Sequence, residues 1–247
     1  MMQDESWFII DGKYCILEDN NFSFPDPRYL KGEWGGVVGV GGNLAPDKLL
    51  EAYSLGVFPW YSENEPILWW CPDPRAVLFP KNFRVSKSFR RVLKNKEYQV
   101  TFDRAFDDVI RWCSKIPRKG QSGTWLNEEL INSFKELYRM GFAHSVEVWM
   151  DGRLAGGLYG LAIGGAFFGE SMFSLRDNAS KIALKAISDV LNKSGYDFID
   201  CQVKTSHLLS LGAVEIPKIE FLDRLKKSIK KRPNINWQNL KWEYSDG

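Results

Sequence analysis

Histidine and clustered cysteine are scarce in this sequence, and their scarcity excludes several kinds of site. The 247 residues include two histidines and four cysteines, and the cysteines lie far apart without a Cys-x-x-Cys pair. A zinc site needs a tight cluster of such ligands, so we predict no metal site. Two histidines leave little room for a hydrolase triad, and there is no Gly-x-Ser-x-Gly turn. The dispersed thiols are typical of a protein in the reducing cytoplasm.

Nucleotide-binding loops and membrane-spanning segments are missing as well. Residues 39–44 are rich in glycine but lack the third glycine of a dinucleotide-binding loop, and there is no Walker loop. No apolar run approaches the ~18 residues of a membrane helix, and the acidic N-terminal residues do not form a secretory signal. The hydrophobic content of 44% is ordinary for a globular protein. We therefore expect a cytoplasmic protein without a cofactor and without a membrane partner.

Positive charge is concentrated in one part of the chain, although the formal net charge is only +2. Residues 81–120 contain twelve Lys and Arg against four Asp and Glu. Ser86 can cap a helix in this segment. The outer face of that helix would be wholly basic, because helical spacing aligns Lys87, Arg90, Arg91 and Lys94. A solvated face usually mixes both signs, so we favour contact with a phosphate backbone over mere solvation.

Turn residues divide the chain into two parts. Residues 44–55 resemble a short helix that Gly56 closes. Five prolines between residues 59 and 80 then exclude a long helix. We place a domain boundary near Asp73 within this stretch. The prediction is a small N-terminal domain of residues 1–72 and a larger domain of residues 73–247.

The second part of the chain alternates between strand and helix patterns. The dipeptide Asp151-Gly152 predicts the turn of a β-hairpin. A helix that begins at Asn178 or Ser180 follows, and residues 198–203 then form a further strand. This order indicates an α/β or α+β domain with a mixed sheet.

Three polar residues within apolar segments are candidates for chemistry. Asp200 and Gln202 lie two positions apart in the predicted strand, so their side chains should share one side, about 7 Å apart. The pair fits an edge strand with a wet face or a cleft, and we favour the cleft. Glu170 follows Gly169 in an apolar stretch. Because an unpaired buried charge is costly, Glu170 must pair with a structural cation or hold a substrate amine.

Tryptophans near the basic segment are candidates for contact with nucleic acid. Aromatic side chains beside basic residues can stack on exposed bases. We expect this of Trp60, which lies among turns, and consider it for Trp125, which follows a Gly-Thr pair. For Trp69 and Trp70 we favour a place in the core.

These segments and their neighbours form an ordered set between about residue 39 and residue 217. They read GGNL at 41–44, GVFPW at 56–60, ILWWCPDPR at 67–75, GTW at 123–125, HSVEVW at 144–149, GGLYG at 156–160, GESMFS at 169–174, NASK at 178–181 and DCQV at 200–203. The set resembles the leucyl/phenylalanyl-tRNA–protein transferases, a bacterial family. Each piece alone is a weak signal, whereas the ordered set is specific.

The resemblance implies an α+β protein with a small N-terminal α/β domain. The C-terminal domain would have the acetyltransferase-like (GNAT) fold, an acyl-CoA N-acyltransferase-like architecture with a mixed sheet. The implied activity moves Leu or Phe, and less well Met, from aminoacyl-tRNA to the N-terminal Arg or Lys of acceptor proteins and marks them for degradation. We expect a monomer.

By position, the resemblance also implies roles for individual residues. Asp200 and Gln202 match the pair that acts on the acceptor amine, and Glu170 matches an active-site carboxylate. The pocket for the donor side chain would be formed by Leu158, Phe167, Met172, Leu184, Ile187 and Ile199. The residues around the terminal adenosine of the tRNA would be Trp60 and Trp125, and the cluster facing the tRNA would include Lys87, Arg90 and Arg91.

The expected reaction needs no ATP, because an aminoacyl ester is already activated. The acceptor amine must be neutral to attack, and its reference pKa is about 8. We expect the side-chain carbonyl of Gln202 to accept a hydrogen bond from this amine, and Asp200 to orient and polarise Gln202.

Two other functions compete with this interpretation. An acyl-CoA N-acyltransferase would need a glycine-rich loop before the helix at Asn178, and residues 174–181 contain no glycine. A non-catalytic RNA-binding protein would explain the basic face and the tryptophans. It would leave Asp200, Gln202 and Glu170 without a role.

Overall fold

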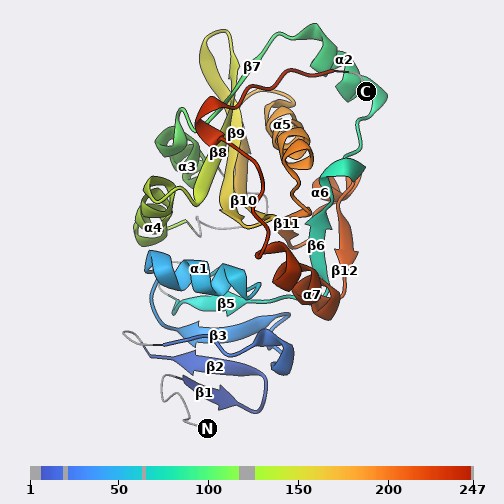
Figure 1. Cartoon of the computed structure of the whole chain (residues 1–247). Helices are drawn as coiled ribbons and strands as arrows, with labels where there is room; N and C mark the ends of the chain where they lie inside the picture. Colours follow the sequence, from blue (N-terminus) through green and yellow to red (C-terminus); the bar gives the residue numbers. More distant parts are fainter. Residues whose placement is uncertain (1–6, 19–21, 63–64, 117–125, 246–247) are drawn as a thin grey trace.

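A five-stranded sheet forms the N-terminal part of the molecule (Figure 1). The computed structural model describes residues 7–18, 22–62, 65–116 and 126–245. Within them, the strand order of this first sheet is β1-β2-β3-β5-β4. Its strands are β1 (Trp7–Ile10), β2 (Tyr14–Leu17), β3 (Val37–Gly41), β4 (Phe58–Pro59) and β5 (Leu68–Trp70).

A seven-stranded sheet forms the rest of the core, in the order β12-β6-β11-β10-β9-β8-β7. Its strands are β6 (Arg75–Leu78), β7 (Gln99–Phe102), β8 (Ala143–Met150), β9 (Arg153–Ile163), β10 (Ala166–Ser174), β11 (Phe198–Gln202) and β12 (Val214–Ile216). The β10–β11 pair is parallel and the other pairs are antiparallel. The predicted α+β class with a mixed sheet is therefore confirmed. The division into domains 1–72 and 73–247 stays a prediction, and it fits the change of sheet between Trp70 and Arg75.

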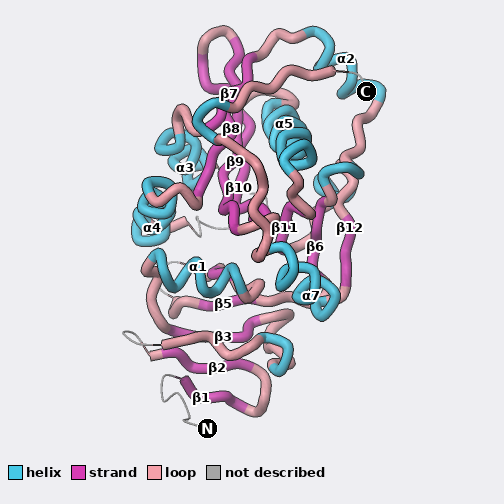
Figure 2. The backbone as a smooth tube through the Cα atoms, viewed as in Figure 1, coloured by secondary structure: helices cyan, strands magenta, loops and turns pink. Residues whose placement is uncertain are grey.

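Helices cover both faces of the larger sheet (Figures 1 and 2). The helices are α1 (Pro46–Ser54), α2 (Lys87–Asn95), α3 (Phe106–Lys115), α4 (Glu128–Arg139), α5 (Ala179–Ser194), α6 (Ser206–Ser210) and α7 (Lys218–Ser228), with single 3-10 turns η1 (Pro27–Tyr29), η2 (Pro80–Asn82) and η3 (Trp237–Asn239). Successive residues of β9 and β10 point to opposite faces. Leu158 and Phe167 lie in the cluster around α5. On the other face, Tyr159 packs against α3 and α4, and Phe168 packs against Tyr53 of α1.

Local signals in the sequence explain where several elements begin and end. The turn at Asp151-Gly152 joins β8 to β9, and its positive φ angles of 51° and 70° are those of a type I′ turn. The basic helix α2 begins at Ser86, whose hydroxyl accepts a hydrogen bond from the backbone N–H of Phe89. Both predictions are confirmed.

Helix α7, in the C-terminal part of the chain, contacts the N-terminal part of the molecule. The Lys218 ammonium at the start of α7 donates to the Leu30 carbonyl at 2.8 Å, and the Lys218 backbone N–H donates to the Asp73 carboxylate at 2.9 Å. Gly56, at the end of α1, is packed so closely by α7 that a Cβ there would lie 2.7 Å from the Leu222 side chain. Among the described helices, none combines the length and apolarity that crossing a membrane requires.

Candidate active site

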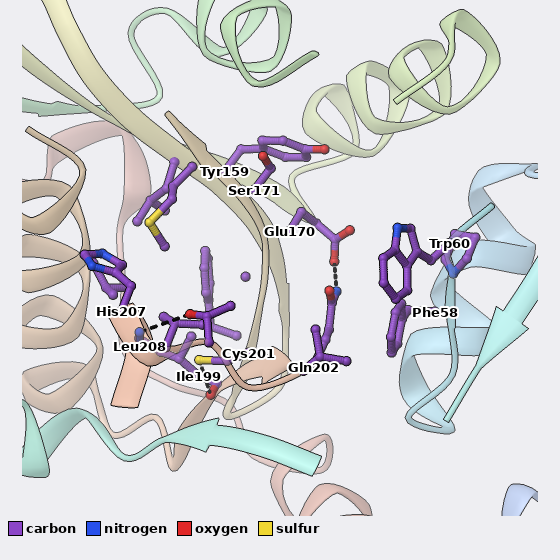
Figure 3. A pocket seen from close by; sticks show the side chains of 18 residues that line it. Phe58, Trp60, Tyr159, Glu170, Ser171, Ile199, Cys201, Gln202, His207 and Leu208 are labelled. Atoms are coloured by element: carbon purple, nitrogen blue, oxygen red, sulfur yellow. Dashed lines mark hydrogen bonds between the residues drawn. The ribbon is translucent and has the colours of Figure 1, made fainter. Parts of the chain in front are cut away.

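A cavity of about 430 Å³ lies where the two sheets meet (Figure 3). The N-terminal sheet contributes Phe58 and Pro59 of β4, followed by Trp60. The larger sheet contributes residues of β9, β10 and β11, and the segment after β11 closes the cavity. The two parts of the chain therefore build the site together.

Most of the predicted donor-pocket residues line this cavity. Its apolar wall includes Leu158, Phe167, Met172, Leu184 and Ile199. A cavity with such a lining suits an apolar side chain of the ligand.

The other predicted aromatic and apolar contacts lie in different places. Trp60 also lines the cavity, and it packs against Trp70 with 5.3 Å between ring centroids. Ile187, on α5, is absent from the cavity wall and is fully buried in the core. Trp125 lies outside the described residues.

Two polar side chains meet at the end of the cavity that faces Trp60 (Figure 3). The side-chain amide nitrogen Nε2 of Gln202 donates a hydrogen bond to Oε1 of Glu170 at 2.9 Å. Each residue lies at an irregularity of its strand. The pairing of β10 with β9 shifts register between Gly169 and Ser171, on either side of Glu170. The backbone of Gln202 has a positive φ of 62°. Bulges of this kind often redirect side chains beside active sites.

The structure corrects the expectation that Asp200 and Gln202 share one face. A register shift between these residues leaves Asp200 fully buried outside the cavity, while Cys201 and Gln202 both line it. The alternative of an edge strand is also wrong, because β11 lies between β10 and β6.

Asp200 is bound instead by Arg75, a residue that the sequence analysis missed. The Arg75 guanidinium donates from Nε to Oδ1 at 2.8 Å and from Nη2 to Oδ2 at 2.6 Å. Phe58 and Phe221 pack on the guanidinium, with their ring centroids 4.7 and 4.5 Å away. A buried carboxylate needs a cation as its partner. The place of Asp200 in an apolar strand therefore indicated that a buried cation was present, although it did not indicate that the cation was Arg75.

Asp200 reaches Gln202 through the main chain. Oδ1 of Asp200 accepts a hydrogen bond from the backbone N–H of Gln202 at 2.9 Å. This bond holds the backbone of a non-glycine residue in the left-handed region, which is costly without support. The hydrogen bond between Asp200 and Gln202 is thus made with the backbone of Gln202, and the expected role of Asp200 in orienting and polarising Gln202 stays a prediction.

Burial raises the pKa of Glu170 to about 8, with a smaller contribution from the charge of Asp200. Interactions with the Tyr53 hydroxyl, the Arg75 charge and the Gln202 amide lower this pKa in part. Among the residues that the structure describes, no lysine or arginine forms an ion pair with Glu170. Of the two roles expected for this carboxyl group, holding an amine is therefore the one that the geometry favours.

The opposite end of the cavity is closed by the short helix α6 (Figure 3). The Thr205 hydroxyl caps this helix by accepting from the Leu208 backbone N–H. His207 belongs to α6 and lines the cavity. Burial and the nearby Lys181 charge lower the pKa of His207, which favours a neutral imidazole. The sequence analysis did not identify His207 as a cavity residue.

The predicted basic face is present on α2. Lys87, Arg90, Arg91 and Lys94 are all exposed. In Figure 1, α2 lies at the end of the larger sheet that is farthest from the N-terminal sheet. A ligand that contacts both α2 and the cavity must therefore be extended.

No group of three or more His, Cys, Asp or Glu side chains in the described part of the chain could hold a metal ion. The cavity instead combines a large apolar wall with a carboxyl group and an amide. Together with the fold, this site defines a class of protein: an α+β protein whose apolar cavity ends on an ionisable carboxyl group.

Comparison with known proteins gives the family. Residues 77–226 match the family model described as "Leucyl/phenylalanyl-tRNA protein transferase", and residues 42–73 match the model of its N-terminal domain. The chain belongs to the leucyl/phenylalanyl-tRNA protein transferase family.

Curated relatives extend this match over most of the chain. Proteins named leucyl/phenylalanyl-tRNA–protein transferase include one from Desulfatibacillum aliphaticivorans, 49% identical over 83% of this chain and 88% of its own. The protein of that name from Nitrosomonas europaea is 49% identical over 90% and 92%. The one from Syntrophus aciditrophicus is 53% identical over 82% and 85%.

Similarity to solved structures is low. The structure of L-PGS from Bacillus licheniformis aligns with a TM-score of 0.39 at 10% identity, over 68% of this chain and 53% of that chain. A GCN5-related N-acetyltransferase from Kribbella flavida aligns with a TM-score of 0.34 at 13% identity, over 73% and 63%. These values support no argument about function.

Proposed function

We propose that this protein transfers Leu or Phe, and less well Met, from aminoacyl-tRNA to the N-terminal Arg or Lys of acceptor proteins. One observation carries the proposal: an apolar cavity that ends on the hydrogen-bonded pair of Glu170 and Gln202. The protein would act as a cytoplasmic monomer in bacteria. Its product, with Leu or Phe at the N-terminus, would be marked for degradation.

The donor side chain would occupy the apolar end of the cavity. A volume of about 430 Å³ accommodates Leu, Met or Phe beside the start of the ribose. Discrimination among these side chains should be weak, because one methylene is worth only ~1–3 kcal/mol in an apolar pocket. The half-buried ring of Trp60 lies at the mouth, where it can stack on the terminal adenine.

The acceptor amine would bind beside the hydrogen-bonded pair of Glu170 and Gln202. Nε2 of Gln202 is already engaged by Glu170, so the amide carbonyl Oε1 is the atom available to accept a hydrogen bond from the amine. The pKa of Glu170, about 8, is close to the reference pKa of an α-amine, ~7.7–8.0. A proton can therefore pass from the amine to Glu170 at little cost in free energy.

The bond changes balance without a further reactant. The amine nitrogen attacks the ester carbonyl carbon, a C–N bond forms, and the C–O bond to the ribose breaks. The amine loses one proton and the ribose oxygen gains one. Glu170 can receive the first proton and supply the second, while Gln202 fixes the direction of attack. Asp200 and Arg75 hold Gln202 in place through its backbone.

The exposed residues Lys87, Arg90, Arg91 and Lys94 of α2 would bind the tRNA backbone. In Figure 1, α2 lies at the end of the larger sheet that is farthest from the N-terminal sheet, which contributes to the cavity wall. This arrangement fits a long polyanion better than a compact one. An acyl-CoA ligand is disfavoured by the segment before α5. There the Ser174 hydroxyl already accepts from the backbone N–H of Ser180, and no glycine is present.

The test is a transfer assay with radiolabelled Leu-tRNA and two peptides that differ only in an N-terminal Arg or Gly. We expect label on the Arg peptide alone, without ATP or CoA. Label on neither peptide, with tRNA still bound, would indicate an RNA-binding protein without catalytic activity. Label that requires CoA would indicate an acyl-CoA transferase.

A further inference from the structure

The C-terminal segment after α7 crosses the same face of the larger sheet as α5 (Figures 1 and 2). Its path leads from α7, past β10, to β8 and on towards α2. The segment lies outside the residues that the family model matches, which end at 226. Its side chains nevertheless join the core beside α5, where Ile235, Trp237, Leu240 and Tyr244 pack.

Trp237 is fixed in this segment by three partners. Its ring stacks on His144 of β8, with 3.8 Å between centroids and 8° between planes. His144 is itself held by Asp103, whose carboxylate lies 2.8 Å from Nδ1. Burial raises the pKa of Tyr196 to about 12, and a hydrogen bond from Trp237 to the Tyr196 hydroxyl lowers it in part. The indole therefore has a defined position.

The third partner of Trp237 is a wall of the cavity. Its ring stacks on Phe167 of β10, with 6.1 Å between centroids and 30° between planes. Phe167 lines the cavity, whereas Trp237 does not, and only 1% of Phe167 is exposed. On the neighbouring strand, a Cβ at Gly160 would lie 2.7 Å from the Phe167 ring. The ring is thus confined by the backbone of β9 and by Trp237.

We propose that Trp237 is a positioning residue that sets the size of the donor pocket through Phe167. This proposal rests on the proposed function, because it assigns the cavity to the donor side chain. Trp237 touches no reacting group. It prevents Phe167 from moving away from the cavity, and so it limits how large a donor side chain can enter.

A purely structural role would have a different consequence. If Trp237 only anchored the C-terminal segment, its loss would reduce the amount of folded protein and lower transfer from every donor by the same factor. Loss of the support behind Phe167 would instead enlarge the pocket and favour the larger donor. The ratio of kcat/KM for Phe-tRNA to kcat/KM for Leu-tRNA separates the two cases.

The experiment compares Trp237→Ala with Trp242→Ala. Trp242 is a matched control in the same tail, because its indole donates to Asp189 at 3.0 Å and packs on Tyr98, away from the cavity. We expect Trp237→Ala to raise the Phe-to-Leu ratio by about tenfold, the lower end of the range that one methylene controls. Trp242→Ala should leave the ratio unchanged.

Trp237→Phe keeps a ring at this position and should shift the ratio in the same direction by less, which provides a test if Trp237→Ala does not fold. A second measurement gives the Phe-to-Leu preference without transfer. It compares the Kd values of non-reactive amide analogues of leucyl-adenosine and phenylalanyl-adenosine. Equal ratios in wild type, both Trp237 variants and the control would overturn the proposal. If the wild type transfers neither amino acid, the proposed function fails. The Kd ratios then test separately whether Trp237 sets the size of the cavity.

Discussion

The buried pair of Arg75 and Asp200 leads to a prediction about stability. Both side chains are fully buried and joined by two short hydrogen bonds. The substitution Asp200→Asn keeps the shape but leaves the Arg75 charge without a counter-ion. Breaking a buried pair in this way costs about 3–5 kcal/mol. We expect Asp200→Asn to lower the free energy of unfolding by that amount in urea denaturation.

A double substitution separates stability from positioning. Replacing a buried ion pair by apolar residues of similar volume is often neutral, and the rings of Phe58 and Phe221 already surround the Arg75 guanidinium. The variant Arg75→Met with Asp200→Leu should therefore recover stability to within about 1–2 kcal/mol of wild type. Its rate of transfer should stay low, because the backbone N–H of Gln202 has lost its acceptor.

The assay measures single-turnover transfer on the three proteins under conditions where each is folded. Wild-type transfer by the double variant would refute the idea that Asp200 positions Gln202. Wild-type stability of Asp200→Asn would refute the assignment of Arg75 and Asp200 as a charged buried pair.

Three more predictions concern Glu170, the donor pocket and α2. Burial raises the pKa of Glu170 from 4.5 to about 8, so the folded protein holds a proton that the unfolded chain releases. The stability of wild type relative to Glu170→Gln should fall between about pH 5 and pH 8, and parallel denaturation curves would contradict this. Leu158→Phe should narrow the cavity and favour Leu over Phe by about tenfold in a competition between the two aminoacyl-tRNAs; an unchanged ratio would exclude Leu158 from the donor pocket. Changing Lys87, Arg90 and Arg91 to Ala should weaken tRNA binding and reduce the slope of log Kd against log salt by about 2–3, whereas an unchanged slope would place the tRNA elsewhere.

Local patterns in the sequence were sufficient for several helices and turns, whereas the apolar side of the site was predicted from the resemblance to the family. The Asp151-Gly152 turn and the Ser86 cap act over a few residues, and both occur where they were predicted. The donor-pocket residues were named by the resemblance to the family, and strand alternation explains why Leu158, Phe167 and Ile199 share one face in the structure.

The arrangement around Asp200 could not be derived in the same way. Strand alternation fails there because of a bulge, which the sequence does not signal with glycine. The partner of Asp200 is 125 positions earlier in the chain, so spacing gives no indication of it. Trp237 was missed for the same reason, since its contact with Phe167 depends on the path of the C-terminal segment.

The central claim is that the Glu170–Gln202 end of the cavity receives the acceptor amine. Its most direct test is the single-turnover rate of transfer from saturating Leu-tRNA to an Arg-starting peptide by wild type, Gln202→Ala and the control Gln99→Ala, which changes an exposed glutamine on β7. We predict that Gln202→Ala slows transfer by about 100-fold or more, as expected for loss of a group that orients the attacking amine, with unchanged tRNA affinity. Transfer by Gln202→Ala at the rate of Gln99→Ala would contradict the account.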